Sequence, residues 1–300
     1  MKPVFRMFLL LLCACLLFGC APTETPVGGG GDPQDGNEST QPKPLERYMH
    51  FSFDDMEHCF RNLKTEGYES IWDEPFLAVL YEAHERYGVK FSLYVWKDVL
   101  HGQSDAYAEE WQAAADWLKI GLHSDGDGNF AEATYEEGRA AWERFVTDVY
   151  EMAGTYEIID RIPRLHNFAG SAEALRGMKE AEHGALGFLA ADDTRLSYAL
   201  DADACAAMRE GDYVKDASGL LYLATDLRCE RHRDELLYDV LAEQYAENLD
   251  TQTCYVLFTH EYEVYDGYTV NGNFDWIHDA AQFFLENEIP FAFPTEFVYQ

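Results

Sequence analysis

From residue 47 onward, the hydrophobic and polar positions of the chain alternate between strand-like and helix-like patterns. Short apolar or alternating runs predict strands over residues 47–54, 89–96, 119–123, 158–165, 185–190, 220–224, 253–259 and 290–293. Apolar residues at helical spacing predict helices over residues 75–87, 105–118, 134–153, 171–182, 202–209, 234–248 and 275–287. Strands that alternate with helices indicate a parallel sheet, and seven or eight such units favour a β/α barrel. An open doubly wound sheet is the alternative architecture.

The first twenty residues have the pattern of a targeting segment. Lys2 and Arg6 give it a positive start, and the apolar run over residues 7–18 is too short to span a membrane comfortably. The run ends in Leu17-Phe18-Gly19-Cys20, which resembles a bacterial lipoprotein cleavage box, so we expect Cys20 to be lipidated. An uncleaved anchor and ordinary secretory cleavage are the alternatives. Lipidation would hold the protein outside the cytoplasm, anchored to a bacterial membrane.

Residues 21–46 are predicted to form a flexible tether, because they are polar and include four consecutive glycines at positions 28–31. Residues 47–300 then form one domain, of a length that is common among α/β barrels.

The formal net charge of the 300-residue chain is -33 at pH 7. Nucleic acid is not a predicted partner, because phosphate binding needs clustered Lys and Arg. An acidic surface suits neutral or cationic ligands and divalent metals. Four of the seven cysteines, Cys59, Cys205, Cys229 and Cys254, lie in the predicted domain. Outside the cytoplasm Cys205 could pair with Cys229, and buried free thiols are the alternative.

Titratable residues recur at the carboxyl ends of the predicted strands, which is where barrels carry their functional groups. The first strand ends in Asp54 and Asp55, and adjacent strand residues can divide two tasks because they point to opposite faces. The simpler interpretation is that this pair caps the next helix or turn. Later strand ends carry His123, Arg164 with His166, Asp192 with Asp193, and His260 with Glu261. This repetition predicts a site at one end of the barrel.

These residues resemble the motifs of the polysaccharide deacetylase (NodB-like) family. The first motif is matched by Ser52-Phe53-Asp54-Asp55, and Phe258-Thr259-His260 approximates a Leu-x-His motif. His123-Ser124-Asp125-Gly126-Asp127 partly matches a His-Ser/Thr-x-x-His motif.

The resemblance implies a distorted barrel of seven or eight strands with a zinc-type metal, held by Asp55, His123 and Asp127. It implies that Asp54 is the catalytic base, that Arg164 lies beside it and that His260 is the acid. Asp192 or Asp193 would orient His260.

Two departures from the family pattern bear on the chemistry. Asp127 stands where the family has His, which would shift the metal preference from zinc toward manganese, iron or calcium. The alternative is that Asp127 is only a turn residue, because the residues around it are typical of turns. The segment after Arg164 lacks the family's proline, which leaves the source of an oxyanion-stabilising backbone donor open. We expect His166 and Glu261 to contact substrate, and a packed barrel position is the alternative for His166.

The residues and the resemblance together predict a metal-dependent hydrolase that removes an acyl group from an amino sugar or glycan outside the cytoplasm. A catalytically silent glycan-binding lipoprotein on the same barrel is the main alternative. A glycosidase with a carboxylate pair such as Asp54 and Glu261 is a third hypothesis.

Overall fold

The computed structural model describes residues 45–126, 128–246, 252–265 and 275–299. Its strands are β1 (Tyr48–Met56), β2 (Phe91–Trp96), β3 (Leu118–Ser124), β4 (Gly187–Leu189), β5 (Tyr213–Lys215), β6 (Leu221–Leu223), β7 (Leu227–Arg228) and β8 (Cys254–His260). Five of them form a parallel sheet in the order β3-β2-β1-β8-β7. The other three form a sheet in the order β4-β6-β5, in which only β5 is antiparallel.

Backbone hydrogen bonds join the two sheets into a distorted barrel. Ile120 of β3 exchanges hydrogen bonds of 2.8 and 2.7 Å with residues 158 and 160, and farther along the same segment the Pro163 carbonyl accepts from Leu189 of β4 at 3.0 Å. On the other side, β6 pairs with β4 and its continuation β7 pairs with β8. The ring therefore runs through β1, β2, β3, segment 158–165, β4, β6 with β7, and β8. The predicted distorted parallel β/α barrel is confirmed, with seven strand positions.

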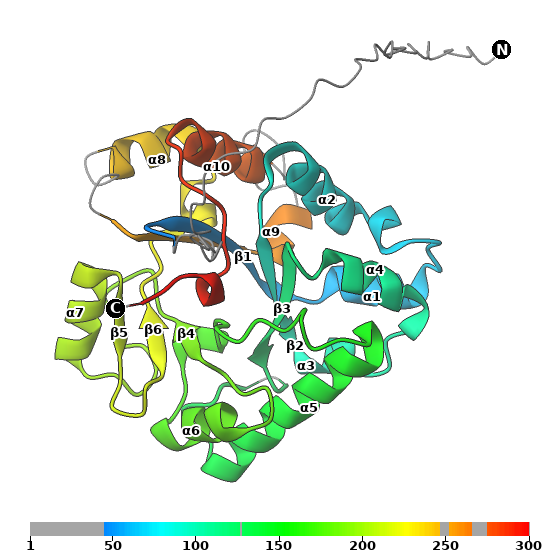
Figure 1. Cartoon of the computed structure of the whole chain (residues 1–300), viewed down its shortest axis with the longest axis horizontal. Helices are drawn as coiled ribbons and strands as arrows, with labels where there is room; N and C mark the ends of the chain where they lie inside the picture. The colour runs from blue at the N-terminus through cyan, green and yellow to red at the C-terminus, as the bar shows by residue number, and fades with distance from the viewer. Residues whose placement is uncertain (1–44, 127, 247–251, 266–274, 300) are drawn as a thin grey trace, which may run out of the picture. The chain divides into compact units, whose positions relative to one another are not determined.

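Helices surround the strands (Figure 1). They are α1 (His58–Thr65), α2 (Pro75–Tyr87), α3 (Lys97–Leu100), α4 (Ala108–Ala114), α5 (Tyr135–Ala153), α6 (Ala172–Glu180), α7 (Ala202–Gly211), α8 (Leu237–Tyr245), α9 (Glu261–Tyr265) and α10 (Asp275–Glu286). A left-handed Gly88 ends α2, and Thr134 with Glu137 forms a capping box at the start of α5. Helices α5 and α6 cross closely at Gly138, where a Cβ would lie 2.3 Å from the Ala174 carbonyl oxygen.

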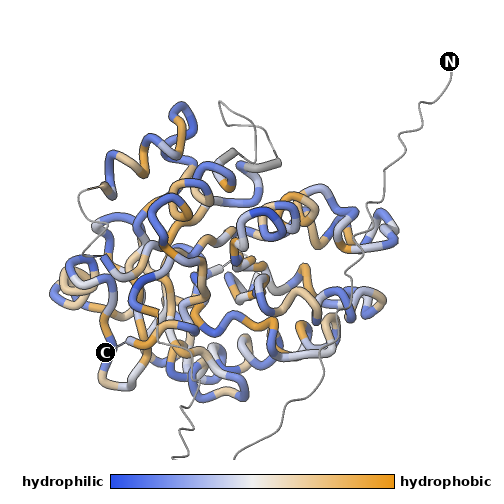
Figure 2. The backbone as a smooth tube through the Cα atoms, turned by 45° about the horizontal axis from the view of Figure 1, so that its top comes forward, coloured by the Kyte–Doolittle hydropathy of each residue, from blue (hydrophilic) through white to orange (hydrophobic). Residues whose placement is uncertain are grey.

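Side-chain alternation along β1 decides what lies inside the barrel. The odd-numbered residues 49, 51 and 53 pack in the main apolar core, against the helices. The even-numbered residues face the interior, where Tyr48 packs in a second apolar cluster with Leu223 and Val256. Farther along the strand the interior residues are polar, and both Ser52 and Asp54 are buried. In Figure 2 apolar stretches are frequent in the middle of the fold, and apolar and polar residues alternate along the outer helices.

Several elements differ from the sequence prediction. The helix predicted over 105–118 is a 3-10 turn (Asp105–Tyr107) followed by α4. The strand predicted over 158–165 is an irregular segment with a single bridge, Ile120–Ile159, because Asp160 closes a side-chain turn by accepting from the Ile162 N–H at 2.8 Å. The strand predicted over 290–293 makes one bridge, Met49–Phe291.

The described residues include no helix that is long and apolar enough to cross a membrane. The four cysteines of the domain are buried and carry free thiols, so the suggested Cys205–Cys229 disulfide is not formed in this structure. Residues 1–44, with Cys20 and nearly all of the tether, lie outside the described residues. Lipidation of Cys20 therefore stays a prediction.

Candidate active site

The site begins at the carboxyl end of β1, where the register with β2 shifts between Phe53 and Met56. Asp55 has a left-handed backbone with φ of 55°, a conformation that Asp tolerates better than most residues. Irregularities of this kind re-aim side chains at the rims of barrels. Asp54 stays buried inside the barrel, whereas Asp55 is partly exposed at its mouth. The two adjacent acids thus occupy different depths of one site.

Asp55, His123 and His166 bring three ligand-type atoms together at the mouth. Nε2 of His123 lies 3.2 Å from Oδ1 of Asp55, and Nδ1 of His166 lies 3.8 Å from the same oxygen. The two imidazole nitrogens are 3.3 Å apart. The structure therefore brings two of the predicted ligands together and adds His166, which was expected only as a substrate contact. Asp127 lies outside the described residues, so its role as a ligand stays a prediction.

The surroundings of His123 and Asp55 favour their ligand forms. Nδ1 of His123 lies 2.7 Å from the Arg164 carbonyl oxygen, so this nitrogen donates and Nε2 keeps its lone pair for the cluster. Burial raises the pKa of the Asp55 carboxyl, but the neighbouring imidazoles, above all His123, outweigh burial and hold this pKa below its ordinary value. The cluster thus offers a carboxylate of lowered pKa, and Nε2 is the ring nitrogen of His123 that faces it.

His166 is held by an unusual turn. Its ring packs against Trp96 with centroids 4.8 Å apart. The next two residues, Asn167 and Phe168, are left-handed, with φ of 59° and 56°. A bulky residue in this region is strained, and such strain is typical of functional sites. Burial and the neighbouring His123 lower the pKa of His166, which favours its neutral form.

The three donor atoms fit a divalent metal ion. Oδ1 of Asp55 is buried and accepts no hydrogen bond of ordinary geometry from the described residues. Ligand atoms about 2.1 Å from a tetrahedral ion lie about 3.4 Å from one another, and the three separations here are 3.2, 3.3 and 3.8 Å. One carboxylate with two imidazoles suits zinc or iron better than magnesium or calcium.

Asp54 is paired with Arg164 inside the barrel, as the resemblance implies. Nη1 of Arg164 donates to Oδ1 of Asp54 and to Oγ of Ser52, both at 2.9 Å, and Nη2 donates to the Thr225 hydroxyl at 3.2 Å. Arg164 is fully buried, and its guanidinium lies 4.0 Å from the centre of the Phe258 ring. These contacts hold the Asp54 carboxylate in one orientation.

His260 ends β8 and is the register partner of Asp54, and its Nε2 lies 3.8 Å from Oδ2 of Asp55. Its Nδ1 forms a 2.6 Å hydrogen bond with Glu230. Burial lowers the pKa of His260, but the Glu230 hydrogen bond and the charges of Asp54 and Asp55 outweigh burial and raise this pKa above its ordinary value. Burial raises the pKa of Glu230, but the hydrogen bonds and charges of His260 and Arg228 outweigh burial and lower this pKa to about 2. The pair therefore favours an imidazolium at His260.

The carboxylate that orients His260 is Glu230, which corrects the prediction of Asp192 or Asp193. Oδ2 of Asp192 lies 3.0 Å from Arg231, and Asp193 pairs with Arg195 at 2.6 Å. Both acids follow β4, which does not neighbour β8, whereas Glu230 follows β7, which does. The sequence signal for Glu230 is weak, because Glu230 stands among arginines and fits a solvated ion pair.

Glu261 is fully buried and caps α1, which corrects the predicted substrate contact. Its two oxygens accept from the backbone N–H groups of Glu57, His58 and Cys59 at 2.6, 2.6 and 2.8 Å. The N–H groups at the start of a helix have no acceptor within the helix itself, so Glu261 supplies the missing acceptor. A glycosidase pair of Asp54 and Glu261 is excluded by the same geometry, because the Glu261 side chain has no exposed surface.

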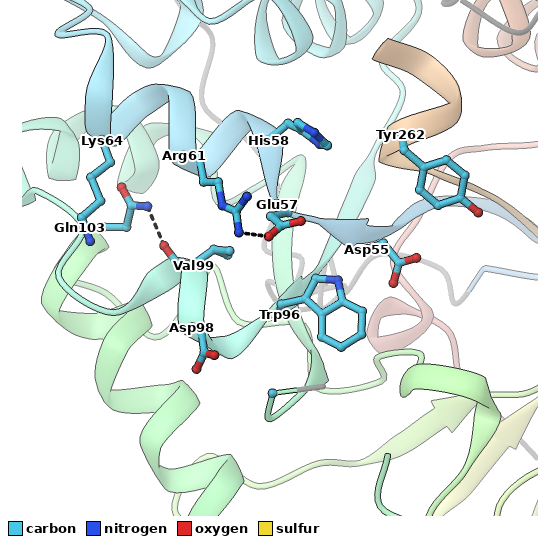
Figure 3. Close-up of a pocket in the computed structure, with 11 residues that line it drawn as sticks. Asp55, Glu57, His58, Arg61, Lys64, Trp96, Asp98, Val99, Gln103 and Tyr262 are labelled. Carbon is cyan, nitrogen blue, oxygen red and sulfur yellow. Dashed lines mark hydrogen bonds and ion pairs between the residues drawn. The ribbon is translucent and has the colours of Figure 1, made fainter. Parts of the chain in front are cut away.

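A cleft of about 600 Å³ leads away from the cluster along α1. Figure 3 shows Asp55, Trp96 and Tyr262 at one end of it and Lys64 with Gln103 at the other. Tyr262 also packs against His260, with ring centroids 5.0 Å apart. Two aromatic side chains thus stand beside the cluster, where they could stack on a sugar ring.

No family model matches the sequence, and no curated protein matches it significantly. A Mycobacterium smegmatis protein named as a polysaccharide deacetylase is similar in structure, with a TM-score of 0.45, 13% identity, and coverage of 82% of this chain and 85% of that one. A family 4 acetyl xylan esterase from Clostridium thermocellum, solved with a cobalt ion, has a TM-score of 0.35, 16% identity, and coverage of 84% and 97%. A 4-alpha-glucanotransferase from Thermococcus litoralis has a TM-score of 0.48, 11% identity, and coverage of 83% and 37%. Similarities this weak do not by themselves assign an activity.

Proposed function

We propose that this protein is a metal-dependent hydrolase that removes an acyl group from an amino sugar or a related glycan. The observation that carries the proposal is the placement of two charged pairs, Asp54 with Arg164 and His260 with Glu230, next to the Asp55 cluster. Acyl transfer to water needs a base for the water and an acid for the leaving group, and these pairs supply one of each. The motif resemblance supports the same reaction class.

A divalent ion held by Asp55, His123 and His166 would supply Lewis acidity toward the acyl carbonyl. Asp54 takes the proton of the attacking water as general base. Arg164 donates to Oδ1 of Asp54, which leaves Oδ2 for the proton transfer.

His260 acts at the other end of the scissile bond. Its imidazolium gives a proton to the leaving nitrogen or oxygen as the bond to the acyl carbon breaks. Glu230 keeps Nδ1 occupied at 2.6 Å, so Nε2, which faces the Asp55 side of the site, delivers the proton. Trp96 and Tyr262 line the cleft beside these groups and are proposed to pack against the sugar.

Acetate release from N-acetylated and O-acetylated oligosaccharides by the zinc-loaded mature domain tests this proposal. Asp54→Asn and His260→Gln should each lower kcat by about 10²- to 10⁴-fold, and both variants should still bind the oligosaccharides. Asp203→Asn, on the exposed face of α7, serves as the matched control. A metal-loaded wild-type protein that binds sugars and releases no acyl group would support the silent glycan-binding alternative instead.

We further propose that the domain is held outside the cytoplasm by lipid on Cys20. The support is the apolar run before Gly19-Cys20 and the polar residues 21–46 after it. Cys20→Ala should abolish labelling by radioactive fatty acid in the bacterial host, and labelling that persists would contradict the anchor.

A further inference from the structure

We infer that His166 is the third protein ligand of the metal site, in place of residue 127, where the motif resemblance puts it. The site is then a centre of two histidines and one carboxylate, of the class that binds zinc or iron. The inference rests on the metal of the proposed function, but it concerns the identity of a ligand and can be tested without turnover.

The first step is the direction of the lone pairs. The Arg164 carbonyl oxygen, 2.7 Å from Nδ1 of His123, makes that nitrogen the donor, so Nε2 presents a lone pair to the cluster. Nδ1 of His166 lies 3.3 Å from this lone pair. Oδ1 of Asp55 lies within 3.8 Å of both nitrogens, so two imidazole nitrogens and one carboxylate oxygen surround a single point, which is the arrangement of ligand atoms around a divalent ion.

The second step is the conformation that places His166. Its turn (His166–Phe168) contains two successive left-handed residues, Asn167 and Phe168. The turn is closed by hydrogen bonds from Phe168 N to the Leu165 carbonyl at 2.9 Å and from Tyr198 N to the Phe168 carbonyl at 2.7 Å. Backbone strain of this kind is concentrated at functional sites, and here it lies directly beside the imidazole that joins the cluster.

The third step is the connection between His166 and the rest of the site. Within three residues, the Arg164 side chain holds Asp54, the Arg164 carbonyl orients His123, and residue 166 offers a nitrogen to the cluster. This short segment therefore orients the proposed base and completes the metal centre. The Asp at position 127 then does not remove a ligand, because the missing imidazole comes from a different strand end.

The assignment changes the expected metal. A ligand set of Asp55, His123 and Asp127 is hard and favours manganese or calcium, whereas Asp55 with two imidazoles favours zinc. Metal-free mature protein should therefore bind one equivalent of zinc and should bind calcium and manganese much more weakly.

X-ray absorption spectroscopy of the zinc-loaded wild-type protein tests the ligand directly. We expect two imidazoles per zinc, and a single imidazole would overturn the inference. Titration calorimetry of metal-free variants gives a second readout. His166→Ala should weaken zinc binding by at least about 100-fold, while Asp127→Asn and the control His101→Ala, whose ring is exposed and next to Asp148, should bind as the wild type does.

Zinc binding that is lost in Asp127→Asn and kept in His166→Ala would overturn the assignment. If His166→Ala fails to fold by circular dichroism, the wild-type spectrum and the His166→Gln variant still decide the question. Zinc with two imidazoles in a protein that releases no acyl group would overturn the proposed function and leave the ligand assignment intact.

Discussion

At the scale of the residue, the protonation of His260 depends on the acidic side chains around it, of which Glu230 is the one hydrogen-bonded to its ring. Burial favours the neutral imidazole, and the carboxylate of Glu230, 2.6 Å from Nδ1, reverses that preference together with the charges of Asp54 and Asp55. Glu230 is itself held by Arg228 and by the Thr259 hydroxyl, the latter at 3.0 Å. The proposed acid therefore depends on a chain of contacts along β7 and β8.

Glu230→Gln should lower the pKa of His260, because the substitution removes a negative charge beside Nδ1. The proposed acid must be protonated to act, so activity falls as the pH rises above the pKa of His260. In the variant this alkaline fall should begin at a lower pH than in the wild type. The measurement is the pH profile of kcat/KM. Glu235→Gln, an exposed acid that pairs with His232, is the control. An alkaline limb that does not move would show that Glu230 has no such role.

At the scale of the element, the ends of strands and helices carry the site. Strand β1 ends in an irregularity that separates Asp54 from Asp55, and α1 begins directly afterwards. The beginning of α1 is fixed by Glu261, which belongs to the element that follows β8. Two neighbouring strand ends are thus tied together beneath the cleft.

Glu261→Ala should lower the free energy of unfolding by about 2–4 kcal/mol, because three backbone N–H groups at the start of α1 lose the buried side chain that accepts their hydrogen bonds. Urea unfolding measures this, with Glu173→Ala at an exposed position of α6 as the control. Zinc affinity should be unchanged. Unaltered stability with weakened sugar binding would instead restore the sequence prediction that Glu261 contacts substrate.

The sequence predicted most elements because their signals are local. The apolar spacing and Gly88 predicted α2 over the residues that it occupies, and the alternating run predicted β2 to within two residues. The acids and His123 at strand ends were identified in the same way. The partners of His260 and the position of His166 were not, because they depend on which strands are neighbours and on a left-handed turn. Neither the order of neighbouring strands nor a left-handed turn produces a repeating pattern of hydrophobic residues in the sequence.

At the scale of the whole molecule, the barrel is completed where β6 passes into β7. Asp226 lies at this join: its backbone N–H donates to the Val256 carbonyl of β8 at 2.9 Å, and its carboxylate accepts from the Val256 N–H at 2.7 Å. Burial raises the pKa of Asp226 to about 7, although the Val256 and Gln252 hydrogen bonds oppose this. Asp226 thus makes a pH-dependent contribution to the stability of the domain.

An acid with a raised pKa in the folded state favours folding only while it keeps its proton. Its contribution is fully present below about pH 4, the ordinary pKa of Asp in an unfolded chain, and is lost as the pH rises through about 7. Asp226→Asn should remove this loss of stability with rising pH, and should raise the free energy of unfolding at pH 8 by about 2–4 kcal/mol. Urea unfolding at pH 5 and pH 8 measures the difference. If the free energy of unfolding changed equally between pH 5 and pH 8 in the variant and the wild type, ionisation of Asp226 would not destabilise the folded state.

Arg164 acts on the site through two chemically independent parts, a guanidinium on Asp54 and a carbonyl on His123. Mutation reaches only the first of these, since every amino acid has the same carbonyl. A descendant that lost the arginine by drift would therefore lose the orientation of its base and still keep an oriented histidine for the metal. Such a protein would still bind the metal after it had lost catalytic activity. A screen of homologues by metal content would therefore count inactive proteins as enzymes.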